Sequence, residues 1–315
     1  MRTQNNNKYC NYSAALLLLT LTTHVSATNL NISYGQQEYQ VNFQDETVTL
    51  NPNGKGAFFG TNLTDDLSLN LDYQTWQGDK NINNRFNTDM KLDTLGASLN
   101  YYLDEWSFSL NYSQSDIDTA VYDLKKAAQT RNENTESFSV GGSLGYGFSS
   151  GTWFYGVLVS GLYSEWDFDK SQIKGKIKSN KAPKILTEKS SGDSTSISSS
   201  LSAAHYWSLS ENTGVMLGAL LSWNYLISGD SVLISRNGRN INTGANQRNT
   251  SRGTGARATN ATALNSISGD DSYGQLAVYI SYDISSSWSV DLDSSVNFES
   301  DSDAFTSSVT LGYVF

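Results

Sequence analysis

The sequence predicts an all-β protein, a transmembrane antiparallel up-and-down β-barrel of about 12 strands. First, apolar and polar residues alternate through most of the chain, as in strands, whose successive side chains point to opposite faces. Second, the 315 residues include 18 Tyr, 12 Phe and 7 Trp but only two Pro. Third, the hydrophobic content is 38%, below the roughly 45–50% of soluble globular chains counted with Gly. A barrel that is apolar only on its outer face accounts for all three.

The amino terminus, residues 1–27, is predicted to be a secretory signal peptide. Arg2 and Lys8 supply the positive region, Ala14–Leu21 the apolar core, and Val25–Ala27 the small residues before cleavage. Residues 28–315 are then expected to form one barrel domain. The only cysteine, Cys10, falls within the signal, so neither a disulfide nor a thiolate metal site is expected in the mature chain.

Period-two alternation indicates twelve strands along the chain. They are expected near residues 29–37, 56–63, 66–76, 91–103, 105–115, 136–148, 152–167, 195–208, 213–228, 272–284, 287–299 and 304–315. Many of these strands run 11–16 residues, longer than the usual five or six and long enough to cross a bilayer at a tilt. No apolar run of about 18 residues occurs in the mature part, so helical spans are not expected.

Four internal strands show the alternation most clearly. In 105–115 and 136–148, aromatic and aliphatic residues alternate with Ser, Asn and Gly; in 272–284 and 287–299 they alternate with Ser, Gln, Asn and Asp. A soluble sandwich or lipocalin-like barrel is the alternative, because alternation alone does not identify the surrounding solvent. The polar faces of these strands would fill a dry core poorly, which favours the membrane barrel.

The connections between the strands alternate in length. Short turns are expected at 63–66, 103–105, 149–152, 208–212 and 285–287, with longer links at 38–55, 77–90, 116–135, 168–194 and 229–271 and a modest link at 300–303. Bacterial outer-membrane barrels have short periplasmic turns and longer outer loops. An even number of strands therefore places both termini on the periplasmic side.

The last strand, Phe305–Phe315, ends on an aromatic residue. Its apolar face consists of Val309, Leu311, Tyr313 and Phe315. This ending resembles the C-terminal insertion signal of bacterial outer-membrane barrels. The resemblance implies that the barrel-assembly machinery reads these four residues, with periplasmic chaperones as further partners during insertion.

The second half of the chain, roughly residues 136–315, resembles the translocator β-domain of autotransporters. The resemblance is carried by the Gly-rich aromatic hairpin Ser137–Trp166, by Gly274–Trp288 and by Leu311–Phe315. It implies a 12-stranded barrel. Because only a few residues separate Ala27 from the first expected strand, a solitary barrel without a passenger is expected.

Four carboxylates on polar strand faces are candidate lumen acids: Asp72, Asp283, Asp291 and Asp293. Asp291 and Asp293 are successive positions on one face, about 7 Å apart from the strand rise. Acids that face a pore favour cations. The alternatives are pairing with loop Lys or Arg residues, or simple hydration.

The two longest links are basic although the whole chain carries a net charge of −10. Twelve of the 21 Lys and Arg residues fall in 168–194 and 229–271, and the candidate contacts to lipopolysaccharide phosphates among them are Lys174, Lys176, Lys178, Arg236 and Arg239. The alternatives are a solvated loop, or entry of 229–271 into the acidic lumen as a plug.

Catalytic motifs are sparse, and no catalytic, cofactor or metal-binding residue is predicted. Of the two histidines, His24 falls in the signal and His205 near a short turn, without the His-x-Ser arrangement of outer-membrane phospholipase. Gly253–Gly255 lacks the strand–loop–helix setting of a phosphate loop. Without Arg2 and Lys8 the net charge falls from −10 to −12, which argues against a nucleic-acid partner.

The predicted function is therefore that of a non-enzymatic outer-membrane barrel with a structural, surface-interaction or limited transport role. The alternative is a narrow, porin-like channel for cations or small solutes with an acidic lumen. An outer-membrane hydrolase would require an acid–acid pair on the loop side.

Overall fold

The computed structural model describes residues 28–43, 46–82, 84–125, 128–174, 184–229, 272–298 and 305–315. Twelve strands close into one antiparallel barrel in the order β1-β14-β13-β12-β11-β10-β9-β8-β7-β6-β5-β4. Their bounds are β1 Thr28–Gln37, β4 Asn53–Asn62, β5 Leu67–Asn81, β6 Phe86–Leu103, β7 Trp106–Asp123, β8 Ala128–Ser150, β9 Trp153–Lys174, β10 Lys184–Ser208, β11 Gly214–Gly229, β12 Ser272–Asp283, β13 Trp288–Phe298 and β14 Phe305–Val314. The predicted fold class and number of barrel strands are confirmed.

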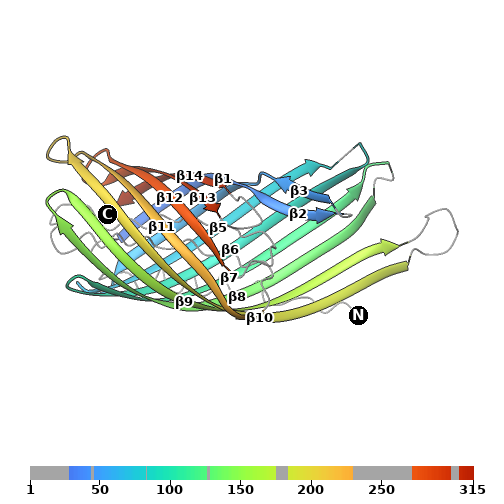
Figure 1. The fold of residues 1–315 in the computed structure, drawn as a ribbon. Coiled ribbons are helices and arrows are strands. Elements are labelled where there is room, and N and C mark those ends of the chain that lie inside the picture. Colours follow the sequence, from blue (N-terminus) through green and yellow to red (C-terminus); the bar gives the residue numbers. More distant parts are fainter. Residues whose placement is uncertain are drawn as a thin grey trace.

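The two ends of the barrel differ, and Figure 1 shows them on opposite sides of the picture. The turn end holds the five short connections 63–66, 104–105, 151–152, 209–213 and 284–287, together with Thr28 and Phe315. The loop end holds the other connections. The barrel closes where β1 pairs with β14, with Leu30 opposite Tyr313.

The strands from β6 to β10 are longer than predicted at the loop end. β8 begins at Ala128 instead of near 136, β9 continues to Lys174, and β10 begins at Lys184. Much of the expected links 77–90, 116–135 and 168–194 is therefore strand. The apolar alternation ends where the outer face becomes polar, but backbone pairing does not depend on apolar side chains and continues beyond that point.

A small hairpin that the sequence did not reveal lies within the expected link 38–55. Its strands, β2 (Tyr39–Phe43) and β3 (Glu46–Leu50), form a separate two-stranded sheet. The amide of Gln37 donates to the carbonyl of Pro52 at 3.2 Å, and the amide of Glu38 donates to the carbonyl of Phe305 at 2.9 Å. These bonds fix both ends of the hairpin beside β1 and β14 at the loop end, where Figure 1 shows it.

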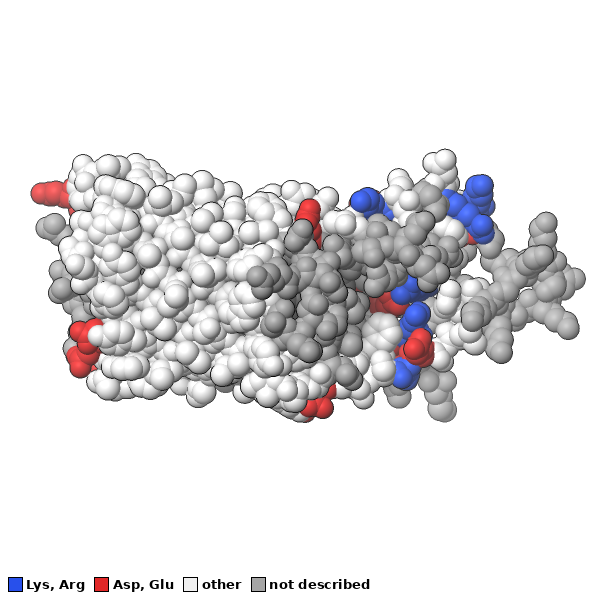
Figure 2. Space-filling view, viewed as in Figure 1, with Lys and Arg blue, Asp and Glu red and all other residues white. Residues whose placement is uncertain are grey.

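The outer face of the barrel carries an apolar belt with no charged residues in the view of Figure 2. On β8 the belt runs from Phe138 to Phe148, and Val140 and Leu144 between them are 49% and 43% exposed. Ten residues span roughly 33 Å along a strand, or about 25 Å across a membrane at a tilt near 40°. This height matches the apolar band of transmembrane barrels.

Both sides of the belt carry outward-facing aromatic residues. Tyr112 and Tyr163 mark its loop-end margin, and Trp106, Trp153 and Trp207 its turn-end margin. Aromatic rings at both margins are typical of the two membrane–water interfaces. No helix in the described ranges has the length and apolar character of a membrane span.

Candidate functional site: the inner wall of the barrel

Every second residue of each strand points inward. Across the belt, most of these inward side chains are polar. On the side formed by β6 to β10, hydroxyl groups bond to one another between strands. The Oγ atoms of Ser139 and Ser164 lie 2.7 Å apart, and those of Ser160 and Ser198 lie 2.6 Å apart. These contacts give that side a neutral, polar surface.

Three of the four predicted lumen acids lie on another side of the same wall, on β12 and β13. Asp283 on β12 and Asp291 and Asp293 on β13 are 8%, 5% and 7% exposed, whereas the alternate residues Leu292 and Val296 are 47% and 39% exposed on the outer face. Register places Asp291 opposite Ser281 and Asp293 opposite Tyr279. The strip formed by β12 and β13 thus brings three of the four acids together.

Asp72 lies apart from this strip, on β5. It is half-buried, and its carboxylate leans over Gly96 on β6, where a Cβ would come within 2.2 Å of Asp72 Oδ1. Three strands, β14, β1 and β4, separate β13 from β5 in the barrel. The fourth acid therefore faces the interior from a different part of the wall than the three acids of β12 and β13.

Nearer the loop end, the inner wall becomes apolar under the β2–β3 hairpin. Leu50 of β3 is fully buried against Trp76, Met90, Leu92 and Ile117, which point inward from β5, β6 and β7. Lys80 Nζ donates to the carbonyl of Thr49 at 2.7 Å and holds the hairpin beside β5. The hairpin therefore covers part of the inner wall at the loop-end mouth.

Ion pairs complete the inner wall at the loop end. Arg85 and Asp123 pair at 2.9 Å. Lys170 Nζ lies 3.8 Å from Glu133 and 3.7 Å from Glu188, and Arg131 also pairs with Glu133. Asp123, Glu133 and Glu188 on the inner wall at this end thus have basic neighbours. In contrast, the described inner face within the belt contains the four acids and no Lys or Arg.

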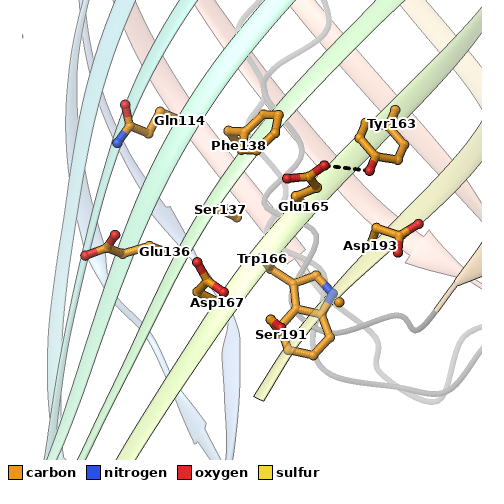
Figure 3. Close-up of a pocket in the computed structure, with 11 residues that line it drawn as sticks. Gln114, Glu136, Ser137, Phe138, Tyr163, Glu165, Trp166, Asp167, Ser191 and Asp193 are labelled. Carbon is orange, nitrogen blue, oxygen red and sulfur yellow. Dashed lines mark hydrogen bonds between the residues drawn. The ribbon is translucent and has the colours of Figure 1, made fainter. Parts of the chain in front are cut away.

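A hollow of about 490 Å³ lies on the outer face just beyond the loop-end margin of the belt (Figure 3). Its carboxylates come from β8, β9 and β10: Glu136, Glu165, Asp167 and Asp193. Register sets Glu136 opposite Asp167 and Asp193 opposite Glu165. Desolvation, followed by the charge of Asp116, raises the pKa of Glu136 above its usual value.

These acids meet on the loop side, as a hydrolase would require, and they were not among the predicted site residues. Glu136, Glu165 and Asp167 fall in the expected strands 136–148 and 152–167, and Asp193 falls in the expected link 168–194. The spacing of Glu165, Asp167 and Asp169 at every second position, which puts them on one face, is the signal for these acids. The eleven residues that line the hollow include no His, Lys or Arg. In the described ranges, no three or more His, Cys, Asp and Glu side chains are grouped to hold a metal ion.

The remaining predicted site residues are widely separated. Val309, Leu311 and Phe315 are 47%, 44% and 71% exposed on the outer face of the last strand, and Tyr313 packs against Phe315 with ring centroids 4.7 Å apart. Recognition of these four residues by the barrel-assembly machinery stays a prediction. His205 lies at the turn end, as predicted, with Nε2 2.7 Å from Thr152 Oγ1.

The predicted basic contacts to lipopolysaccharide fall mostly outside the described residues. Lys176, Lys178, Arg236 and Arg239 lie there, as do the signal peptide and residues 230–271. Lys174 is the last residue of β9, and its side chain is not among those described. Contact with lipopolysaccharide and the plug alternative both stay predictions.

Comparison with known proteins gives matches only at the level of structure. No family model and no curated protein sequence matches the chain. The translocator domain of the autotransporter NalP from Neisseria meningitidis has a TM-score of 0.61 at 10% identity, covering 98% of this chain and 95% of that one. The β domain of the Bordetella autotransporter BrkA has a TM-score of 0.56 at 10% identity, over 92% and 100% of the two chains.

The transport unit of the autotransporter AIDA-I from Escherichia coli gives a TM-score of 0.51 at 12% identity, with all of both chains covered. Identities of 10–12% establish similarity of fold alone. The predicted resemblance is confirmed at the level of fold and extends over the whole barrel. The chain has the closed 12-stranded architecture of autotransporter translocator domains.

Proposed function

We propose that this chain is a non-enzymatic barrel of the bacterial outer membrane that provides a narrow, cation-preferring passage through it. The observation that carries the proposal is the charge of the inner wall across the apolar belt. Asp72, Asp283, Asp291 and Asp293 point inward there, and the described inner face at that height contains no Lys or Arg. The turn end faces the periplasm and the loop end faces the outside, as in other outer-membrane barrels.

Electrostatics gives the passage its preference. Asp291 and Asp293 are about 7 Å apart along β13, and two like charges at that distance repel by about 2 kcal/mol at an effective dielectric constant near 20. A cation between them relieves this repulsion, whereas an anion meets two carboxylates. Rings or strips of acidic side chains select cations for the same reason.

The loop-end mouth supports a narrow passage instead of a wide pore. The β2–β3 hairpin packs Leu50 against the inner faces of β5, β6 and β7 and so occupies part of the mouth. Small hydrated cations fit such a passage better than large solutes do. A 12-stranded barrel is also smaller than the 16–18-stranded porins that hold wide aqueous channels.

Two observations support a non-enzymatic role. The eleven residues that line the outer hollow include no histidine, so its carboxylates lack the partner that most often serves as a general base. His205 lies at the opposite end, where its ring packs between Trp153 and Trp207 at centroid distances of 4.6 and 4.2 Å. Packing between two outward tryptophans at the margin of the belt favours an interfacial role for His205.

Reversal potentials in planar bilayers test the proposed passage. Across a potassium chloride gradient, we expect the wild-type protein to show a reversal potential of the sign set by cations. Asp291→Asn with Asp293→Asn should move this potential towards zero. Asp193→Asn, the same chemical change on the outer face, is the matched control and should leave it unchanged. A silent bilayer, or equal effects of both substitutions, would refute the proposal.

A further inference from the structure

The charges at the two ends of the barrel are of different kinds. The five turns, all of which are described, contain no Lys or Arg, and their charged residues are Asp65, Asp66, Asp104, Glu105 and Glu211. The Lys and Arg residues whose side chains are described all lie towards the loop end: Lys55, Lys80, Arg85, Lys91, Lys125, Arg131, Lys170 and Lys189. In Figure 2 one end shows red and no blue, and all the blue lies towards the other end, where red is also present.

A continuous row of rings, here called the aromatic ribbon, runs around the turn end across β7, β8, β9 and β10. In order, its members are Trp106, Tyr146, Phe148, Tyr155, Trp153, His205 and Trp207. Consecutive ring centroids are 5.0, 6.2, 5.1, 6.2, 4.6 and 4.2 Å apart. Strand register produces the row, because Trp106 lies opposite Tyr146, Phe148 opposite Tyr155, and Trp153 opposite His205.

The acidic turns adjoin the aromatic ribbon directly. Glu105 immediately precedes Trp106, and its carbonyl accepts a hydrogen bond of 2.8 Å from the amide of Gly147, between Tyr146 and Phe148. At the other end of the ribbon, Glu211 lies in the turn that follows Trp207. Carboxylates therefore lie at both ends of the aromatic ribbon, and together with the ribbon they form a rim at the turn-end margin of the apolar belt.

We propose that this rim selects phospholipids with ammonium headgroups, such as phosphatidylethanolamine, over anionic phospholipids. An ammonium group is attracted by aromatic faces through cation–π interaction and by carboxylates through charge. An anionic headgroup without an ammonium group meets only carboxylates at this rim. The aromatic ribbon continues the apolar belt, so the lipid whose acyl chains cover the belt places its headgroup at the ribbon.

The contrast with the loop end identifies lipid as the occupant of the rim. The loop end carries every described Lys and Arg and is suited to a leaflet rich in phosphate groups, whereas the turn end is suited to ammonium groups. The inference does not depend on conduction through the barrel, because it concerns only the outer surface.

Tryptophan fluorescence can report on this rim selectively. Of the seven tryptophans, Trp106, Trp153, Trp207 and Trp288 face outward at the turn end, Trp223 faces outward near the loop end, and Trp76 and Trp166 are buried. In a Trp223→Phe background, every lipid-facing tryptophan therefore lies at the turn end. Lipids brominated near the headgroup would quench these four residues on contact.

The experiment compares three brominated lipids in phosphatidylcholine vesicles that contain the reconstituted protein. Phosphatidylethanolamine should quench most, an uncharged glycosyl diacylglycerol less, and phosphatidylglycerol least. The expected preference of phosphatidylethanolamine over phosphatidylglycerol is about threefold. Asp104→Asn, Glu105→Gln and Glu211→Gln together should reduce it towards one. The matched control, Glu165→Gln, Asp167→Asn and Asp193→Asn, removes three outward acids near the loop end and should retain it.

Folding of each variant is checked by the heat-dependent gel mobility of the reconstituted barrel. Equal or stronger quenching by phosphatidylglycerol in the wild-type background would overturn the inference. So would an unchanged preference in the folded turn-end triple variant, or an equal loss in the loop-end control.

Discussion

The ring of Tyr279 on β12 lies over Gly218 on the neighbouring strand β11, where a Cβ would come within 2.2 Å of Tyr279 Cζ. Tyr279 is 3% exposed, so its ring has little room to move. Trp76 covers Gly54, and Trp166 covers Gly192, in the same way. Inward aromatic rings thus occupy space that glycines leave on adjacent strands.

We expect Gly218→Ala to destabilise the barrel by about 1–3 kcal/mol, because the new methyl group must displace a packed ring. The midpoint of unfolding in urea, followed in vesicles, measures the effect. Gly161→Ala is the control, because nothing lies within 4 Å of a Cβ there. Tyr279→Ala should make the Gly218→Ala change nearly neutral, and a full effect in the double variant would disprove the packing explanation.

Leu50→Ala should loosen the β2–β3 hairpin from the inner wall. The side chain is fully buried among Trp76, Met90, Leu92 and Ile117, and removing a buried leucine costs about 2–5 kcal/mol. Proteolysis of the reconstituted barrel should then cleave residues 38–52 faster. The control is Leu124→Ala, whose side chain is 50% exposed. Equal protection in both variants would mean that Leu50 does not hold the hairpin.

Glu136→Gln should stabilise the barrel above the raised pKa of Glu136. Glu136 lies between Asp116 and Asp167 in register, and burial and these charges raise its pKa. The folded state therefore holds the proton more tightly than the unfolded state, and stability falls as the pH rises from the usual value of 4.5 through the raised pKa. Because the group is partly exposed, we expect a gain of about 0.5 kcal/mol or less.

Unfolding midpoints across pH 4 to 8 measure the change in stability, and the gain from Glu136→Gln should vanish below the usual glutamate pKa of 4.5. Glu188→Gln is the comparison, because Lys170 lies 3.7 Å from that carboxylate. That change removes an attraction and should not stabilise the barrel. A gain from Glu136→Gln that persists at the acidic end would point to a cause other than charge repulsion.

Deletion of Phe315 should reduce the fraction of protein assembled in the outer membrane by more than half. Phe315 is 71% exposed at the turn end of the outer face, and its ring makes an edge-to-face contact with Tyr313. Membrane fractionation with heat-dependent gel mobility measures the assembled fraction. The conservative change Thr310→Ser, on the other face of the strand, should assemble normally. Normal assembly of the deletion would remove the proposed insertion signal.

The sequence predicted the parts of the fold that lie against lipid. On β13, Leu292 and Val296 alternate with Asp291 and Asp293 because one face contacts an apolar solvent and the other does not. That contrast disappears beyond the belt, so the extra length of β9 and β10 left no apolar period to detect. The β2–β3 hairpin was missed because its packing depends on Trp76 and Ile117, which are distant in sequence.

The site could be predicted to a similar extent. Period-two alternation was enough to place Asp283, Asp291 and Asp293 on the inward face. It could not reveal the hollow beside Glu136 and Glu165, because cross-strand register, and not spacing along the chain, brings those carboxylates together. The aromatic ribbon likewise depends on register across four strands.

Thiol labelling along β13 most directly tests whether its acidic face meets water inside a membrane-spanning wall. The only cysteine of the chain is Cys10, so in a Cys10→Ser background each introduced cysteine reports alone. A water-soluble maleimide should label Asp291→Cys and Asp293→Cys in vesicles and spare Leu292→Cys. Equal labelling at Leu292→Cys, or no labelling at either inward position, would contradict a hydrated acidic passage.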